Sequence, residues 1–310
     1  MTADEDELAP AQSGAAPPDP EELTAAPAPS AGRLSAATRL GPVSLTVAQL
    51  DRSLAFYREV VGLETQERHD GRAALGAGAA TLLELVEEPG ARPAHGYTGL
   101  YHVALLLPER ADLARWLAHA ARDRVRLQGL SDHFVSEAIY LADPDGHGLE
   151  LYWDRPRERW EGRVRERLTT LPLDVDALLA ELPDPATAAF DLLPEGTVVG
   201  HVHLKVASIP DTVAFYREVV GFELMAQLGA QAAFLAAGGY HHHLGANTWE
   251  SAGAPPPPPG TAALRYATLA LAGEAEREAL LARARARGAA SELGGRPAVV
   301  DPSGNAFVLV

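Results

Sequence analysis

The chain has 310 residues, of which 47% are hydrophobic, and its 26 basic and 42 acidic side chains give a formal net charge of −16. This apolar content is sufficient for one or two folded cores and excludes a chain that is disordered throughout. The negative charge argues against nucleic-acid binding, because a polyanion would be repelled on average. The chain contains no cysteine, which excludes disulfides, thiolate nucleophiles and thiolate metal sites.

The N-terminal segment, residues 1–38, consists mainly of Ala, Pro, Ser, Asp and Glu, with Arg33 as its one basic residue. Such a composition buries too little apolar area to offset the entropy of ordering, so the sequence predicts a disordered tail. Residues 1–8 lack the basic and apolar regions of a signal peptide, and no apolar run approaches the roughly 20 residues that span a bilayer. We therefore expect a cytoplasmic protein without membrane contact.

An internal repeat organises the rest of the chain. Residues 41–64 (GPVSLTVAQLDRSLAFYREVVGLE) align without gaps to residues 200–223 (GHVHLKVASIPDTVAFYREVVGFE), with 14 identities in 24 positions. A looser pair is DPDGHGLEL at 143–151 and DPSGNAFVL at 301–309. The two halves of the chain are therefore duplicates.

Each half has the pattern strand, helix and three strands, followed by a second unit of the same kind. In the first half the repeat begins with a strand and a helix, then short strands are expected over 63–69, 72–76 and 80–86. The next unit has a strand over 100–107, a helix over 109–124 and further strands up to 150–153. In the second half the alternation of His201, His203 and Lys205 with apolar residues predicts a strand, and Ser208 and Gly221 are the expected ends of the next helix. Strands over 222–228, 231–236, 240–248 and 263–271, a helix over 274–287 and a hairpin over 297–310 complete the series.

This order predicts an α+β fold built from four tandem βαβββ modules. We expect a first domain of two modules over 39–153, a helical connector over 154–199 and a second domain of two modules over 200–310. The two pairs of modules should form curved, barrel-like sheets around a cleft.

Histidines and one glutamate are the candidate functional residues. His102 and His201 lie in the opening strands of the second and third modules, and Glu150 follows a DPDG turn in the last strand of the second module. Strand alternation turns all three away from the helices and toward the cleft. Two imidazoles and one carboxylate on one face of a metal are typical of non-haem Fe(II) oxygenases, in which substrate and O₂ occupy the open positions.

Most other histidines have a simpler interpretation as hydrogen-bonded or surface residues, which we prefer for His69, His95, His119 and His147. The triplet of residues 241–243 lies within GGYHHHLGANTW. In a strand, His241 and His243 would share one face and His242 would occupy the other. An incidental surface run remains the alternative for the triplet.

The segments HVHLKV, AFYREVVGFE, YHVALLLP and YLADPDGHGLELYWDRP resemble the vicinal oxygen chelate superfamily, which includes glyoxalase I, fosfomycin-resistance proteins and extradiol dioxygenases. The resemblance covers roughly residues 40–310, and GGYHHHLGANTW is similar to bacterial catechol-2,3-dioxygenase-type proteins. It implies metal ligands on the first and last strands of two paired modules. Pairing in chain order puts Pro42 in a ligand position of the first half, and Tyr266 and Val308 in ligand positions of the second.

Pairing of the second module with the third instead yields His102, Glu150 and His201 as ligands, with the triplet at the fourth ligand position. The resemblance then implies an Fe(II)-dependent ring-cleaving dioxygenase that acts on a catechol-type diol with O₂; Mn(II) or another divalent metal is the alternative cofactor. His241, His243 and His133 are the expected acid–base groups, and Tyr240 is an expected hydrogen-bond donor. We expect His203, Asn247 and Trp249 to contact the substrate.

Two other functions remain open within the same superfamily. One is a glyoxalase-like lyase or isomerase, which usually has four metal ligands and needs no O₂. The other is a non-catalytic protein that binds or sequesters a small molecule. The sequence leaves open which diol is used and whether the chain forms a homo-oligomer.

Overall fold

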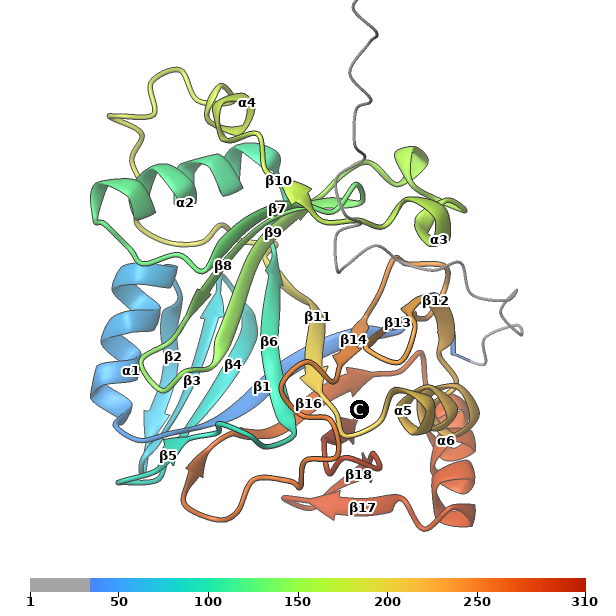
Figure 1. Cartoon of the computed structure of the whole chain (residues 1–310). Helices are drawn as coiled ribbons and strands as arrows, with labels where there is room; N and C mark the ends of the chain where they lie inside the picture. The colour runs from blue at the N-terminus through green and yellow to red at the C-terminus, as the bar shows by residue number, and fades with distance from the viewer. Residues whose placement is uncertain (1–33) are drawn as a thin grey trace, which may run out of the picture.

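The computed structural model describes residues 34–310, and four units of strand, helix and three strands make up most of this range (Figure 1). Module 1 comprises β1 (Arg39–Val47), α1 (Leu50–Phe56) with a π-turn (Tyr57–Val61), β2 (Glu64–His69), β3 (Arg72–Ala77) and β4 (Ala80–Glu87). Module 2 comprises β6 (Gly99–Leu106), α2 (Arg110–Arg122), β7 (Gly129–Asp132), β8 (Ser136–Ala142) and β9 (Gly148–Asp154). The predicted α+β class and the four βαβββ modules are confirmed.

Module 3 comprises β11 (Val198–Lys205), α5 (Ile209–Phe215) with a π-turn (Tyr216–Val220), β12 (Glu223–Leu228), β13 (Ala232–Ala236) and β14 (Leu244–Asn247). Module 4 comprises β16 (Leu264–Ala270), α6 (Glu274–Ala286), β17 (Ala290–Leu293), β18 (Arg296–Val300) and β19 (Ala306–Leu309). The short strands β5 (Arg92–Pro93) and β15 (Thr261–Ala262) pair with each other. The connector holds a 3₁₀ turn (Arg157–Arg159), α3 (Val164–Arg167), β10 (Leu171–Pro172) and α4 (Val175–Leu179).

The helix ends follow local chemistry. Ser208 caps α5 by accepting a hydrogen bond from the Asp211 amide. In both copies of the repeat the sequence YREVV forms a π-turn, which ends at a glycine with positive φ, Gly62 at 92° and Gly221 at 105°. Only glycine adopts that conformation without strain. The ends predicted for the helix of module 3, Ser208 and Gly221, are therefore confirmed.

The sheets pair modules that are not neighbours in the chain. The nine-stranded sheet joins modules 2 and 3 through antiparallel β6 and β11, in the order β10-β7-β8-β9-β6-β11-β14-β13-β12. The eight-stranded sheet joins modules 1 and 4 through antiparallel β1 and β16, in the order β17-β18-β19-β16-β1-β4-β3-β2. Figure 1 shows β6 and β11 side by side at the centre of the molecule. The predicted pairing of modules 2 and 3 is confirmed.

Helix contacts connect the modules in the other direction. Tyr57, at the start of the first π-turn, donates a hydrogen bond to Asp143 Oδ2 of the DPDG turn in module 2 at 3.0 Å. Tyr216 in module 3 makes the equivalent bond to Asp301 of module 4 at 3.1 Å. Each module therefore contacts one partner through its sheet and another through its helix, and all four form one interlocked body.

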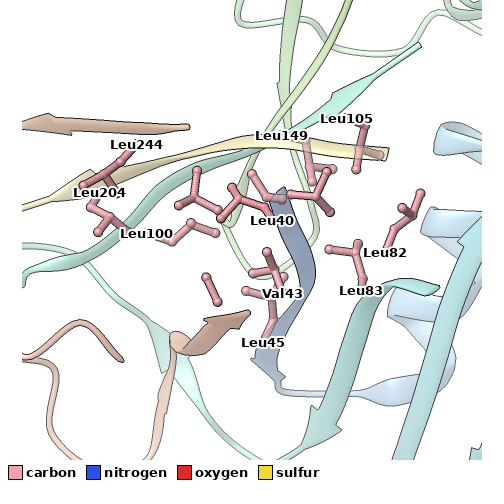
Figure 2. Packing of buried hydrophobic residues seen from close by; sticks show 14 of the residues in the cluster. Leu40, Val43, Leu45, Leu82, Leu83, Leu100, Leu105, Leu149, Leu204 and Leu244 are labelled. Carbon is pink, nitrogen blue, oxygen red and sulfur yellow. The ribbon is translucent and has the colours of Figure 1, made fainter. Parts of the chain in front are cut away.

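The core lies where the two sheets face each other. Figure 2 shows Leu40, Val43 and Leu45 of β1 packed near leucines of β6, β9, β11 and β14. These strands bury one set of alternate side chains in this core, including Val103, Leu149 and Val202. The other set therefore points to the opposite face of the nine-stranded sheet.

Three expectations differ from the structure. Residues 1–33 of the predicted tail lie outside the described residues, but Leu34 and Thr38 are buried, at 7% and 0% exposure, and Ser35 N donates to Glu276. The connector contains single turns in place of a continuous helix over its first part. The strand expected over 240–248 begins only at Leu244, so the histidine triplet lies in the preceding loop. Within residues 34–310 no helix is long and apolar enough to cross a membrane.

Candidate metal centre and its cavity

Three neighbouring strands bring His102, Glu150 and His201 together. His102 lies on β6, which runs parallel to β9, where Glu150 is found, and antiparallel to β11, where His201 is found. The core contains Val103, Leu149, Leu151 and Val202, each of which is next to one of the three residues in its strand. Alternation therefore turns His102, Glu150 and His201 to the opposite face. All three are buried, at 6%, 2% and 2% exposure.

The ligand atoms of this cluster have the spacing of a metal site. Glu150 Oε2 lies 2.9 Å from His102 Nε2 and 3.0 Å from His201 Nε2, and the two Nε2 atoms are 3.3 Å apart. Three ligands on one face of an octahedron, each about 2.1 Å from a cation, lie about 3.0 Å from one another. Within residues 34–310 this is the one group of three such side chains with ligand atoms within 4.8 Å of one another. The cluster therefore fits a divalent metal.

The electrostatics of the cluster favour a cation. Burial alone would raise the pKa of Glu150, but the imidazoles of His201 and His102 hold that pKa well below its ordinary value. Burial lowers the pKa of His201, and Glu150 only partly offsets the effect. An ionised carboxylate and a neutral imidazole are the protonation states that bind a metal.

The fourth ligand position is a glycine. Glu150 stands opposite Ala104 of β6, and the equivalent pair in module 3 is His203 of β11 opposite Gly245 of β14. A Cβ atom at Gly245 would lie 2.8 Å from the His203 ring. The absence of a side chain at Gly245 makes room for the His203 ring. The prediction that the histidine triplet lies at the fourth ligand position is wrong.

A cavity of about 970 Å³ opens over the three candidate ligands. Its lining includes aromatic rings from both modules, polar groups and two cationic side chains: Tyr101, Tyr140, Phe234, Trp249, His133, His203, His242, Arg126 and Lys205. The volume suits a small organic molecule. Of the predicted substrate contacts, His203 and Trp249 line the cavity, whereas Asn247 is fully buried outside its lining.

On the module 2 side, His133 and Tyr140 form a hydrogen-bonded pair. His133 Nε2 lies 2.7 Å from the Tyr140 hydroxyl, and its Nδ1 lies 2.8 Å from the Thr169 carbonyl oxygen of the connector. A carbonyl only accepts, so Nδ1 carries the proton and Nε2 accepts from Tyr140. The Tyr140 ring is 5.5 Å from that of His102. The sequence indicated His133 but missed Tyr140, which alternation in β8 would have turned toward the Glu150 face.

On the module 3 side, His242 is the member of the triplet that lines the cavity, and its ring centroid lies 4.1 Å from that of His201. Behind it, His241 Nδ1 lies 2.8 Å from His242 Nδ1, and His241 Nε2 lies 2.8 Å from Asp154 Oδ1. Burial, then the neighbouring His201 and His241, lower the pKa of His242 well below its ordinary value. Strand alternation predicts the opposite arrangement, with His241 and His243 facing the cleft and His242 facing away from it.

The other predicted catalytic residues lie outside the cavity lining. His241 is buried behind His242, and Tyr240 donates to Asp154 at 2.7 Å and lies 3.0 Å from the Tyr152 hydroxyl. His243 stacks on Phe222 and accepts a hydrogen bond from the Ala237 amide at 3.2 Å. Burial lowers the pKa of His243 to about 3, so the ring is neutral. The structure thus brings His133 and His203 to the cavity, but not His241, His243 or Tyr240.

Among the residues that the structure describes, the eight-stranded sheet has no equivalent group of three candidate ligands. Glu84 of β4 and Tyr266 of β16 stand opposite the same residue, Ser44 of β1, and the Tyr266 hydroxyl donates to Glu84. The guanidinium of Arg296 donates to that hydroxyl and lies over the ring, 4.9 Å from its centroid. The nine-stranded sheet has His102 and His201 at its centre. The eight-stranded sheet instead has Tyr266, which Arg296 contacts through a hydrogen bond and a cation–π contact.

Comparisons with known proteins agree with this geometry. The Glyoxalase/Bleomycin resistance protein/Dioxygenase superfamily matches residues 39–151 and 198–309. The catechol-2,3-dioxygenase of Bacillus subtilis (strain 168) is 40% identical over 279 residues, which are 87% of this chain and 96% of that protein. The crystal structure of glyoxalase I from Zea mays is similar in fold, with a TM-score of 0.54 and 17% identity over 88% of this chain and 92% of that one. The chain belongs to the Glyoxalase/Bleomycin resistance protein/Dioxygenase superfamily, and its similarity to a dioxygenase over most of its length makes it a metal-dependent oxidoreductase of the dioxygenase type.

Proposed function

We propose that this protein cleaves the ring of a catechol-type aromatic diol with O₂, using Fe(II) held by His102, Glu150 and His201. The observation that carries the proposal is the geometry of the three ligand atoms, 2.9 to 3.3 Å apart on one face of a buried cluster below the cavity. Bound iron would supply one-electron chemistry and open coordination positions for the two diol oxygens and O₂. The similarity to a catechol-2,3-dioxygenase supports the same reaction class.

His242 is suited to remove a proton from the diol. The Asp154 carboxylate only accepts hydrogen bonds, so His241 Nε2 carries the proton of their 2.8 Å contact. In neutral His241 the Nδ1 atom then accepts, which puts the proton of the next contact on His242 Nδ1. The Nε2 atom of His242 is left with a lone pair at the cavity, which is the state of a general base.

Tyr140 and His133 are suited to orient the second diol oxygen. In the sheet order, β8 with Tyr140 and the loop before β14 with His242 lie on opposite sides of the three ligand strands. Polar groups therefore flank the proposed iron site on both sides. Tyr140 holds or returns a proton at its hydroxyl, and His133 Nε2 accepts from that hydroxyl.

The fourth ligand position argues against the lyase alternative. Enzymes of that kind usually hold their metal with four histidine and glutamate ligands, and here Gly245 occupies the fourth position. Three protein ligands leave the additional open position that O₂ requires.

The test is anaerobic reconstitution with Fe(II), followed by an oxygen-uptake assay with a panel of catechols. Glu150→Gln should lose stoichiometric iron and turnover, because an amide lacks the negative charge that a buried cation requires. The matched control is Glu84→Gln in the other sheet, at the equivalent strand position, which should retain both. Absence of uptake with every diol, from protein that binds iron, would overturn the proposal.

A further inference from the structure

We propose that the cavity takes an aromatic diol that carries a carboxylate substituent, and that Lys205 binds this carboxylate beyond the aromatic wall formed by Tyr101, His203 and Trp249. The inference rests on the proposed function, since it specifies the substrate of the same cavity. Its evidence concerns the side chains that line the cavity along β11 beyond His201.

Lys205 lies on the same strand as a candidate metal ligand. His201, His203 and Lys205 are alternate residues of β11, and all three line the cavity. Alternate residues of a strand are separated by roughly 6.6 Å, so the backbone positions of His201 and Lys205 are roughly 13 Å apart. The flexible lysine side chain covers part of this distance. A diol bound at the metal end would therefore direct a substituent along β11 toward Lys205.

Three aromatic rings, those of Tyr101, His203 and Trp249, line the cavity between the candidate metal ligands and Lys205. The His203 ring lies 5.2 Å from the ring of Tyr101 and 5.7 Å from that of Trp249, and Tyr101 and Trp249 are 5.4 Å apart. Such a surface binds the faces and edges of a planar ring. His203 is 4% exposed, and its Nε2 atom has no hydrogen-bond partner among the residues that the structure describes. His203 therefore contributes to the wall through its ring, since its Nε2 atom is buried from solvent.

The ammonium group of Lys205 has unused bonding capacity. Lys205 is the sole lysine of the chain, and its Nζ atom donates to the Ala94 carbonyl oxygen at 3.1 Å. An ammonium has three donors, so two remain. Within residues 34–310 no carboxylate lies in ion-pair contact with it, and the nearby Glu250 is exposed at the cavity rim. Burial lowers the pKa of Lys205, and a carboxylate in contact with Nζ would offset that cost of desolvation.

The experiment compares dihydrocaffeate, a catechol with a short acid side chain, with its neutral methyl ester. Binding is measured by calorimetry without oxygen, on the protein as purified and after loading with Fe(II). The wild-type protein should bind the acid about ten-fold or more tightly than the ester, as expected for a charge-assisted hydrogen bond. Lys205→Met, which preserves length and removes charge, should abolish this preference while the affinity for the ester stays the same.

The matched control is Arg126→Met, which removes another cation that lines the same cavity on the module 2 side. This variant should keep the preference for the acid. Equal binding of acid and ester by the wild-type protein would overturn the inference, as would an equal loss of both ligands in Lys205→Met, which would assign Lys205 to holding the Ala94 backbone. A Lys205-dependent preference in a protein that consumes no oxygen would contradict the proposed reaction and leave this inference standing.

Discussion

Asp154 acts on the cavity without touching it. Its two carboxylate oxygens accept from His241 and Tyr240, and the His241 contact determines which nitrogen of His242 faces the cavity. Asp154 is thus a positioning residue for the proposed base. Its position at the last residue of β9 gave no sign of this role, because the contact is made by a loop 87 residues away.

Asp154→Asn should reduce kcat/KM by roughly 100-fold with unchanged iron content. The amide can donate to His241, which would reverse the tautomers of His241 and His242. The measurements are oxygen uptake and iron analysis of the same preparation. Asp154→Glu, which keeps a carboxylate, should restore part of the rate. A variant that loses iron and rate together would show that Asp154 supports the fold of the site instead.

His243 should make stability depend on pH. Its pKa is about 3 in the folded protein and 6.5 in the unfolded chain, so the unfolded chain binds more protons between these values. Stability from this residue is complete above pH 6.5 and falls by about 1.4 kcal/mol for each pH unit below it. His243→Asn retains an acceptor for the Ala237 amide and does not titrate. The difference between the free energies of unfolding at pH 7 and pH 5 should therefore be about 2 kcal/mol smaller in the variant.

The relevant measurement is urea denaturation at both pH values. A variant whose stability declines between pH 7 and pH 5 as steeply as that of the wild-type protein would show that His243 does not carry this dependence.

At the scale of elements, the close approach of β6 and β9 sets the site. A Cβ atom at Gly148 would lie 2.0 Å from the Tyr101 carbonyl oxygen and 3.0 Å from His102 Cβ. Glu150 follows two residues later on β9. The spacing between two candidate ligands therefore depends on the absence of a side chain at Gly148.

Gly148→Ala should destabilise the fold by about 1–3 kcal/mol and weaken iron binding, because β9 must move away from β6. Gly129→Ala in β7 is the control, since the nearest atom to its added Cβ is Tyr140 Cδ2 at 3.7 Å, an ordinary contact. Thermal unfolding and iron titration measure both effects. Equal melting temperatures for the two variants would refute this dependence on close strand packing.

The loop before β14 shows where periodicity reaches its limit. The sequence predicts a strand over residues 240–248, but the strand covers only Leu244–Asn247. Two glycines with positive φ, Gly238 and Gly239, let the chain turn sharply after β13. Hydrogen bonds and ring contacts to residues distant in the sequence then fix the histidine triplet in place. A local sequence pattern cannot predict such contacts.

At the scale of the whole molecule, the candidate metal centre is formed by both halves of the chain. His102 and Glu150 come from the first half and His201 from the second. The first half alone would expose β1 and β6 as unpaired edge strands, and the second half alone would expose β11 and β16. Unpaired edge strands are prone to association.

Halves divided after Gly196 and produced separately should therefore aggregate and bind no iron at the three-ligand site. Co-expression should restore a soluble complex with one iron per pair. Size-exclusion chromatography with iron analysis provides the measurement. A monomeric half that binds iron tightly would be incompatible with a centre shared between modules 2 and 3.

The amino-acid sequence by itself determined the four modules, because repeats, strand alternation and helix caps are local and directly readable. It also indicated His102, Glu150 and His201 as candidate ligands, through their places in the strands and the resemblance to a known superfamily. Only the tertiary structure decided that His242 and Tyr140 face the cavity and that Gly245 lies at the position expected for a fourth ligand. It alone also decided that Lys205 lines the cavity together with His201 and His203 of β11. These facts depend on register between strands and on a loop held by remote side chains, and the energies that select them arise when distant parts of the chain meet.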